Sequence, residues 1–167
     1  MIARGAIDKN LAALEKMYNA STSASKALLY SKSAILELCG WIEETMDNII
    51  IACGNRKIKN SGLRNHLRTK IVEKNYGFEY KRNFRNMLSQ VIGLTGVEKL
   101  EKKVDPTKFQ ILCSVLVTLK SSRDLEAHTH IKGVTRRLNA PSITIVQFNQ
   151  VYDGLKDIEE KLKKLNF

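Results

Sequence analysis

Apolar residues recur at helical spacings of three, four or seven along this 167-residue chain, and this pattern predicts amphipathic helices. The first predicted helix covers about residues 6–18, and a polar segment separates it from the next. The second covers about residues 25–53, or about 40 Å at 1.5 Å per residue, and we expect it to end at Cys53-Gly54. Its apolar stripe consists of Leu28, Ile35, Leu38, Ile42, Met46, Ile49 and Cys53.

Two further long helices are predicted in the second half of the chain. Asp105 is a candidate N-cap and Pro106 suits the first helical position, so one helix begins there. Its apolar face consists of Phe109, Leu112, Leu116 and Leu119, and the next position on that face is Arg123. Pro141-Ser142 opens the last helix, whose face consists of Phe148, Val151, Tyr152, Leu155, Ile158, Leu162 and Leu165.

The middle of the chain carries weaker helical patterns. We predict short helices over residues 62–73 and 81–92, with a break at NYGFEY between them and glycines after the second. Together with the four long helices, these segments predict an all-α fold, an antiparallel helical bundle of four main helices plus short helices. The length suits a single domain, residues 1–167, in which the basic stretch of about 55–96 has the character of an insertion.

The net charge of +11 and the pI near 9.7 favour polyanionic partners. The excess is local, because residues 56–85 carry ten lysines and arginines against two glutamates. Within this stretch we assign RNA-phosphate contacts to Arg64, Arg68, Lys81, Arg82 and Arg85. Four aromatic residues are interleaved with them, Tyr76, Phe78, Tyr80 and Phe84. They fit either base stacking or the hydrophobic core, and we favour the core.

Cysteine usage and hydropathy bear on the cellular compartment. The three cysteines, Cys39, Cys53 and Cys113, are odd in number and lie in apolar surroundings, as expected of buried thiols in a reducing compartment. No apolar run approaches the roughly 20 residues of a membrane span, and the first residues lack the hydrophobic core of a signal peptide. We therefore expect a cytoplasmic protein with no membrane partner.

Candidate chemistry is concentrated in SSRDLEAHTHIKG, residues 121–133. Arg123 continues an apolar stripe, and a guanidinium in such a position is costly unless an anion meets it. A carboxylate of the long second helix, Glu43 or Glu44, is a possible partner across the bundle. If the helix continues, Asp124 and His128 lie four residues apart on one face, where the carboxylate can orient the imidazole and raise its basicity.

This segment resembles the signature of HEPN superfamily nucleases. In that signature an arginine, often followed directly by a polar residue, is separated from a histidine by four to six residues. The sequence RDLEAH matches each element, with Arg123, Asp124 and His128 in those roles. His130 also falls within the permitted spacing, so the choice between the two histidines stays open. The resemblance extends over residues 24–53 and 106–165 and does not cover the basic middle.

The resemblance implies a metal-independent endoribonuclease with no cofactor, in which Arg123, Asp124, His128 and His130 are the candidate catalytic residues. It also implies a homodimer whose two copies face a shared RNA cleft. Many HEPN nucleases are toxins or phage-defence effectors, and a nucleotidyltransferase-type antitoxin is an implied partner. Imidazole and guanidinium groups suit this chemistry, because they can supply the base, the acid and the positive charge that cleavage beside a 2′-hydroxyl requires.

Two alternatives remain. Asp124, Glu126, His128 and His130 alternate, so on a strand they would share one face and could bind zinc or manganese. The position between helices disfavours a strand there. The second alternative is a non-catalytic helical module that binds nucleic acid or a nucleotide through its basic face and mediates dimerisation. It differs from the nuclease in having no need for an intact Arg123 and His128.

Overall fold

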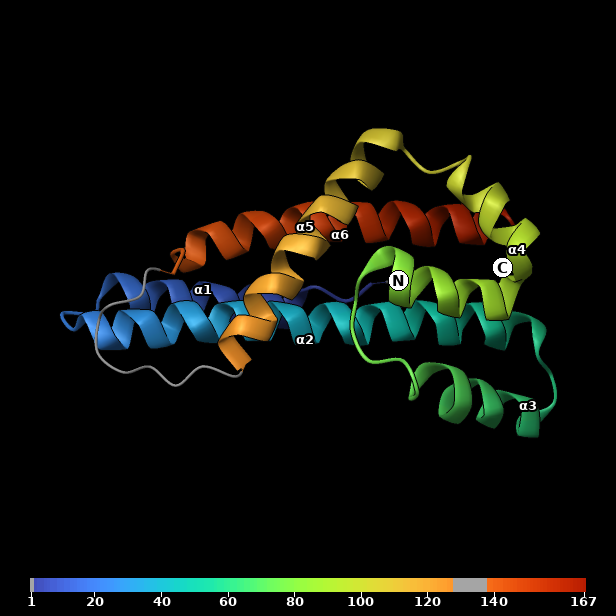
Figure 1. Ribbon diagram of the computed structural model, residues 1–167, viewed down its shortest axis with the longest axis horizontal. Coiled ribbons are helices and arrows are strands. Elements are labelled where there is room, and N and C mark those ends of the chain that lie inside the picture. The colour runs from blue at the N-terminus through green and yellow to red at the C-terminus, as the bar shows by residue number, and fades with distance from the viewer. Residues whose placement is uncertain (1, 128–137) are drawn as a thin grey trace.

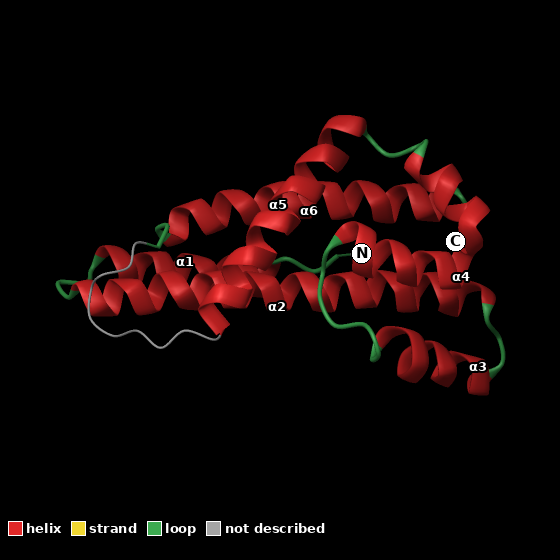
Figure 2. Ribbon diagram, in the orientation of Figure 1, coloured by secondary structure: helices red, strands yellow, loops and turns green. Residues whose placement is uncertain are grey.

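Helices make up all the regular structure in residues 2–127 and 138–167, the part of the chain that the computed structural model describes (Figure 2). The predicted all-α bundle is therefore confirmed. The α-helices are α1 (Gly5–Asn19), α2 (Ala24–Lys57), α3 (Ser61–His66), α4 (Arg85–Glu101), α5 (Pro106–Ala127) and α6 (Pro141–Lys164). There are also two π-helical segments. η1 (Leu67–Val72) directly follows α3, and η2 (Tyr80–Phe84) directly precedes α4.

Successive helices reverse direction along the long axis of the molecule, so α2 and α6 run the same way (Figure 1). α2 is the central element and contacts α1, α4, α5, α6 and η1. α5 crosses the bundle obliquely and packs against both α2 and α6 (Figure 1). Among the described helices, none combines the length and the apolar character that a membrane crossing requires.

The predicted starts of α5 and α6 are confirmed at Pro106 and Pro141. The Asp105 carboxylate accepts a hydrogen bond from the backbone N–H of Lys108 at 2.9 Å, as an N-cap residue does. The backbone N–H of Asp105 donates to the Asp157 carboxylate of α6 at 2.8 Å. The start of α5 is thus held to α6 as well as capped.

The predicted end of α2 at Cys53-Gly54 is wrong, because the helix continues to Lys57. Gly54 is buried, and the side chain of Leu67 occupies the space that a Cβ atom would need. This glycine therefore allows η1 to approach α2 closely instead of ending the helix. Arg64 covers the actual end of α2, where its guanidinium donates to the carbonyls of Ile58 at 2.8 Å and Asn55 at 3.2 Å.

The middle of the chain follows its predicted pattern with one extension. Residues 61–72 are helical through α3 and η1, and the predicted break follows them. α4 continues past the predicted end at residue 92 to Glu101. Gly93 has φ 73° and ψ 165°, a left-handed φ that glycine adopts readily, and it divides α4 into two short parts. Gly96 lies within the second part instead of breaking the helix.

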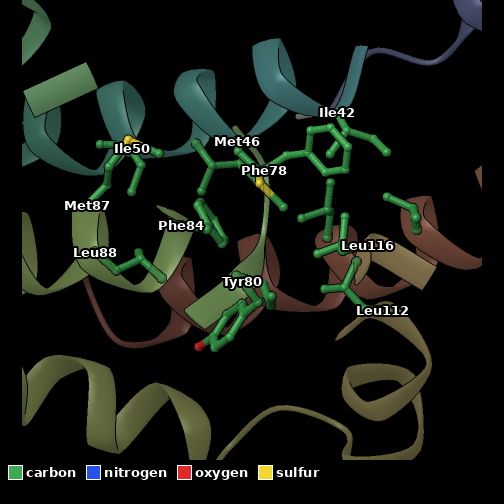
Figure 3. Packing of buried hydrophobic residues seen from close by; sticks show 14 of the residues in the cluster. Ile42, Met46, Ile50, Phe78, Tyr80, Phe84, Met87, Leu88, Leu112 and Leu116 are labelled. Carbon is green, nitrogen blue, oxygen red and sulfur yellow. The ribbon is translucent and has the colours of Figure 1, made fainter. Parts of the chain in front are cut away.

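Three aromatic side chains of the basic stretch belong to the core, which confirms that interpretation for them. Phe78 and Phe84 are fully buried and Tyr80 nearly so, whereas Tyr76 is 84% exposed. Figure 3 shows Phe78, Tyr80 and Phe84 in one cluster with buried side chains of α2, α4 and α5. These rings dock residues 78–84 onto the bundle and are not available for base stacking.

A close contact between α5 and α6 fixes the distance between these two helices. Gly154 of α6 is buried, and a Cβ atom added to it would lie 2.7 Å from Cβ of Leu112. Such a distance is well inside van der Waals contact, so only glycine allows the two backbones to approach this closely. The contact positions the helix that carries Arg123.

Candidate functional site

Arg123 lies in the penultimate turn of α5, at the edge of the buried stripe and not inside it. Its side chain is 36% exposed. Leu119 before it and Glu126 after it are each 1% exposed. The buried face of α5 therefore continues past Arg123 to the carboxyl group of Glu126. The guanidinium that continues the apolar stripe is therefore only partly buried. At this position the aliphatic part of the Arg123 side chain can pack against apolar residues while the guanidinium stays accessible to a ligand.

Glu43 of α2 is the partner of Arg123, which confirms one of the two predicted pairings. An Arg123 Nη atom lies 3.3 Å from a carboxylate oxygen of Glu43, whose side chain is 30% exposed. Glu44 is exposed and lines two surface hollows against α1, together with Ala6 and Trp41. The helical rotation of α2 separates these neighbouring carboxylates, so only Glu43 faces α5.

Asp124 follows Arg123 on the exposed side of α5. Its carboxylate lies 2.7 Å from Nζ of Lys120 and 3.8 Å from the nearer guanidinium nitrogen of Arg123. His128 and His130 lie outside the described residues. The predicted orientation of His128 by Asp124, and the choice between the two histidines, therefore stay predictions.

The strand that the metal alternative requires is contradicted over its first half. α5 continues to Ala127, so Asp124 and Glu126 are helical. Residues two apart on a helix point about 200° apart instead of sharing a face. Asp124 is accordingly exposed and Glu126 buried.

Cys39 of α2 is the thiol nearest to this site. Burial raises its pKa to about 12, against the opposing effect of the positive charge of Arg123. The negative charges of Glu43 and Asp124 add to the rise. A thiol with this pKa stays protonated at neutral pH and is a poor nucleophile. Among the described residues, Cys39 is therefore not a candidate nucleophile for the Arg123 site.

Asp47 lies one helical turn beyond Glu43 on α2. Burial raises the pKa of its carboxyl group to about 6, and the charges of Glu43 and Glu44 add to this effect. The Glu43 carboxylate that faces Arg123 therefore has a neighbour that takes up a proton within the mildly acidic range.

We expect Asp47→Asn to raise the free energy of unfolding at pH 7.5 and to have little effect below about pH 4. The pKa of Asp47 is about 6 in the folded chain against an ordinary 3.8, so the folded state binds this proton more tightly. Protonation of Asp47 therefore stabilises the folded state fully at a pH below 3.8, the ordinary pKa, and this stabilisation disappears as the pH rises through 6. Urea unfolding at both pH values tests this, and an equal effect at the two values would contradict it.

The five predicted RNA-binding residues fall into two groups. Arg64 covers the end of α2, and the Arg85 guanidinium forms an ion pair with Glu101 at 2.8 Å. Arg68, Lys81 and Arg82 are exposed, and their side chains form no ion pair within residues 2–127 and 138–167. The two engaged arginines stabilise the fold, whereas the other three cations are available to a ligand.

A groove between η2 and α5 was not predicted from the sequence. It has a volume of about 360 Å³ and is lined by Glu79, Tyr80, Lys81, Arg82, Cys113, Ser114 and Val117. The one signal in the sequence was an apolar residue off the buried stripe, Val117, which is 56% exposed. No family model, curated protein or solved structure matches the chain.

Proposed function

We propose that this chain is a metal-independent endoribonuclease of the HEPN type. The observation that carries the proposal is the position of Arg123, which is partly exposed near the end of α5 and paired with Glu43 of α2. His128 and His130 follow it within seven residues of sequence. A fixed cation and an imidazole so close in the chain are the groups that cleavage beside a 2′-hydroxyl needs.

In the proposed reaction a histidine, His128 or His130, removes the proton of the 2′-hydroxyl. The 2′-oxygen attacks the adjacent phosphorus, the bond from phosphorus to the 5′-oxygen breaks, and an acid protonates the departing oxygen. Arg123 stabilises the negative charge that develops on the phosphorane oxygens. The products are a 2′,3′-cyclic phosphate and a 5′-hydroxyl end, and DNA is inert because it lacks the nucleophile.

Glu43 supports this role by holding the guanidinium before RNA arrives. The pair is partly exposed, so a phosphate can approach Arg123 without a large rearrangement of the core. A guanidinium has five N–H donors, which allows it to contact a carboxylate and a phosphate together. We assign Glu43 as a positioning residue on this basis.

The family resemblance extends the proposal to the cellular role. It favours a cytoplasmic toxin or phage-defence effector that acts as a homodimer and is neutralised by a nucleotidyltransferase-type antitoxin. The high positive charge supports RNA as the substrate, since polyanion binding by lysine and arginine is driven by counterion release.

The proposal is tested by incubating the purified chain with labelled single-stranded RNA in EDTA and identifying the end groups. We expect cleavage to cyclic-phosphate ends, loss of cleavage in either His128→Ala or His130→Ala, and no cleavage of DNA of the same sequence. The unaffected histidine variant serves as the matched control for the affected one. Absence of cleavage in the unaltered chain, or products with 3′-hydroxyl ends, would overturn the proposal.

The second candidate is a non-catalytic module that binds nucleic acid. The exposed cations Lys81 and Arg82 beside an apolar groove wall favour it, because they suit binding without contributing to bond cleavage. RNA binding that depends steeply on salt, without any cleavage, distinguishes this function from the nuclease.

A further inference from the structure

The groove between η2 and α5 combines cations with an apolar wall. Lys81 and Arg82 come from η2, and Cys113, Ser114 and Val117 come from α5. The positive charge of Lys81 acts on the Cys113 thiol, so these two elements face each other across the groove. This mixture suits a nucleotide, whose phosphate binds cations while the base covers apolar surface.

The charges of the groove leave a net attraction for anions. Glu79 also lines it, but Lys81 and Arg82 outnumber this carboxylate. Nearby cations are already engaged, since Arg85 pairs with Glu101 and Lys120 with Asp124. Within the described residues, a ligand can therefore bind Lys81 and Arg82 of the groove without breaking an internal ion pair.

The groove and the Arg123 site lie along the same helix, α5. Cys113, Val117, Lys120 and Asp124 follow one another at helical spacings of three or four, so they lie on one face of the helix. The ten residues from Cys113 to Arg123 cover roughly 15 Å at 1.5 Å per residue. A stacked strand with about 3.4 Å per nucleotide would place about four nucleotides over this distance.

We propose that this groove is a subsite for a single RNA strand, which binds Lys81 and Arg82 and runs along α5 to Arg123. The choice of RNA rests on the proposed function. Val117 provides the apolar contact for a base, because it is exposed in the groove, whereas Tyr80 packs edge-on against Phe109 at 4.7 Å between ring centroids.

Alkylation of Cys113 by N-ethylmaleimide reports on the groove without requiring cleavage. Cys113 is half-buried in the groove, whereas Cys39 and Cys53 are buried in the core and show whether the chain stays folded. The probe is a short 2′-O-methylated oligouridylate, which cannot be cut because its 2′-oxygen carries no proton. At ten times its Kd it should slow alkylation about tenfold, since about one site in eleven remains free.

A second reporter removes the dependence on the reactivity of Cys113. In the double variant Cys113→Ser with Val117→Cys, the thiol occupies an exposed position on the same wall, and the oligouridylate should protect it equally. Lys81→Ala with Arg82→Ala should abolish protection at the same oligouridylate concentration and reduce the magnitude of the slope of log K against log salt by about 1.4, or about 0.7 for each phosphate contact of a single strand. The control, Arg56→Ala with Lys57→Ala, removes two cations from the last turn of α2, outside the groove lining, and should retain protection.

The outcomes test the proposed subsite independently of the proposed nuclease activity. Binding without protection of either thiol would overturn the subsite and leave the proposed catalysis intact. Equal protection by an acidic polyglutamate peptide would also overturn it, because the groove would then fit acidic proteins. Protection by the oligouridylate in a chain that cuts no RNA would support the subsite while the nuclease fails.

Discussion

Arg123→Ala is expected to slow RNA cleavage by about 100- to 1000-fold, the usual effect of removing one group that stabilises a developing oxyanion. The loss should fall on kcat, because the phosphorane carries more negative charge than the ground-state phosphate. Stability should change little, since a partly exposed ion pair contributes only about 0–1 kcal/mol. Single-turnover cleavage together with a thermal melt measures both effects.

Two variants serve as controls for this result. Arg123→Lys keeps the charge but loses the planar, forked donors, so it should recover only part of the rate. Glu43→Gln removes the charge of the partner and keeps its shape, so it should slow cleavage less than Arg123→Ala while leaving the end groups unchanged. Full activity in Arg123→Ala would remove Arg123 from the mechanism.

Phe84→Ala is expected to lower the free energy of unfolding by about 3–5 kcal/mol, as large-to-small changes at fully buried aromatic positions do. Phe84 is completely buried and contacts Tyr80 at 6.1 Å between ring centroids. At about 2–4 °C per kcal/mol for a chain of this size, the Tm should fall by roughly 6–20 °C. Urea unfolding followed by circular dichroism measures the free energy directly.

Tyr76→Ala is the matched control for Phe84→Ala. Tyr76 belongs to the same aromatic series but is 84% exposed, so its loss should change stability by no more than about 0.5 kcal/mol. Similar effects of the two substitutions would mean that residues 78–84 are not docked into the core.

The periodicity of the sequence was sufficient to predict the long helices. Apolar spacing located α1, α2, α5 and α6, and the Asp105-Pro106 pair fixed the start of α5 within a residue. These features depend on neighbours in the sequence, so they can be recognised without knowledge of the fold. A partner for Arg123 was also predicted to be Glu43 or Glu44, because a guanidinium beside an apolar stripe needs an anion from a facing helix, and the choice between the two needed the structure.

Features that depend on packing between distant segments were missed. Gly54 looked like a helix end, yet it accommodates Leu67, which no local pattern indicates. Arg64 and Arg85 looked identical to the available cations until their partners, the α2 carbonyls and Glu101, were known. The η2–α5 groove likewise requires two segments about thirty residues apart in sequence to meet.

The contact between Gly154 and Leu112 links the sizes of two positions that lie 42 residues apart. A methyl group gained at position 154 must be offset by volume lost at position 112, or α5 must move outward and carry Arg123 away from Glu43. Neither position can therefore be altered independently. In a selection for active variants of Gly154→Ala, second-site suppressors should arise first as smaller side chains at position 112.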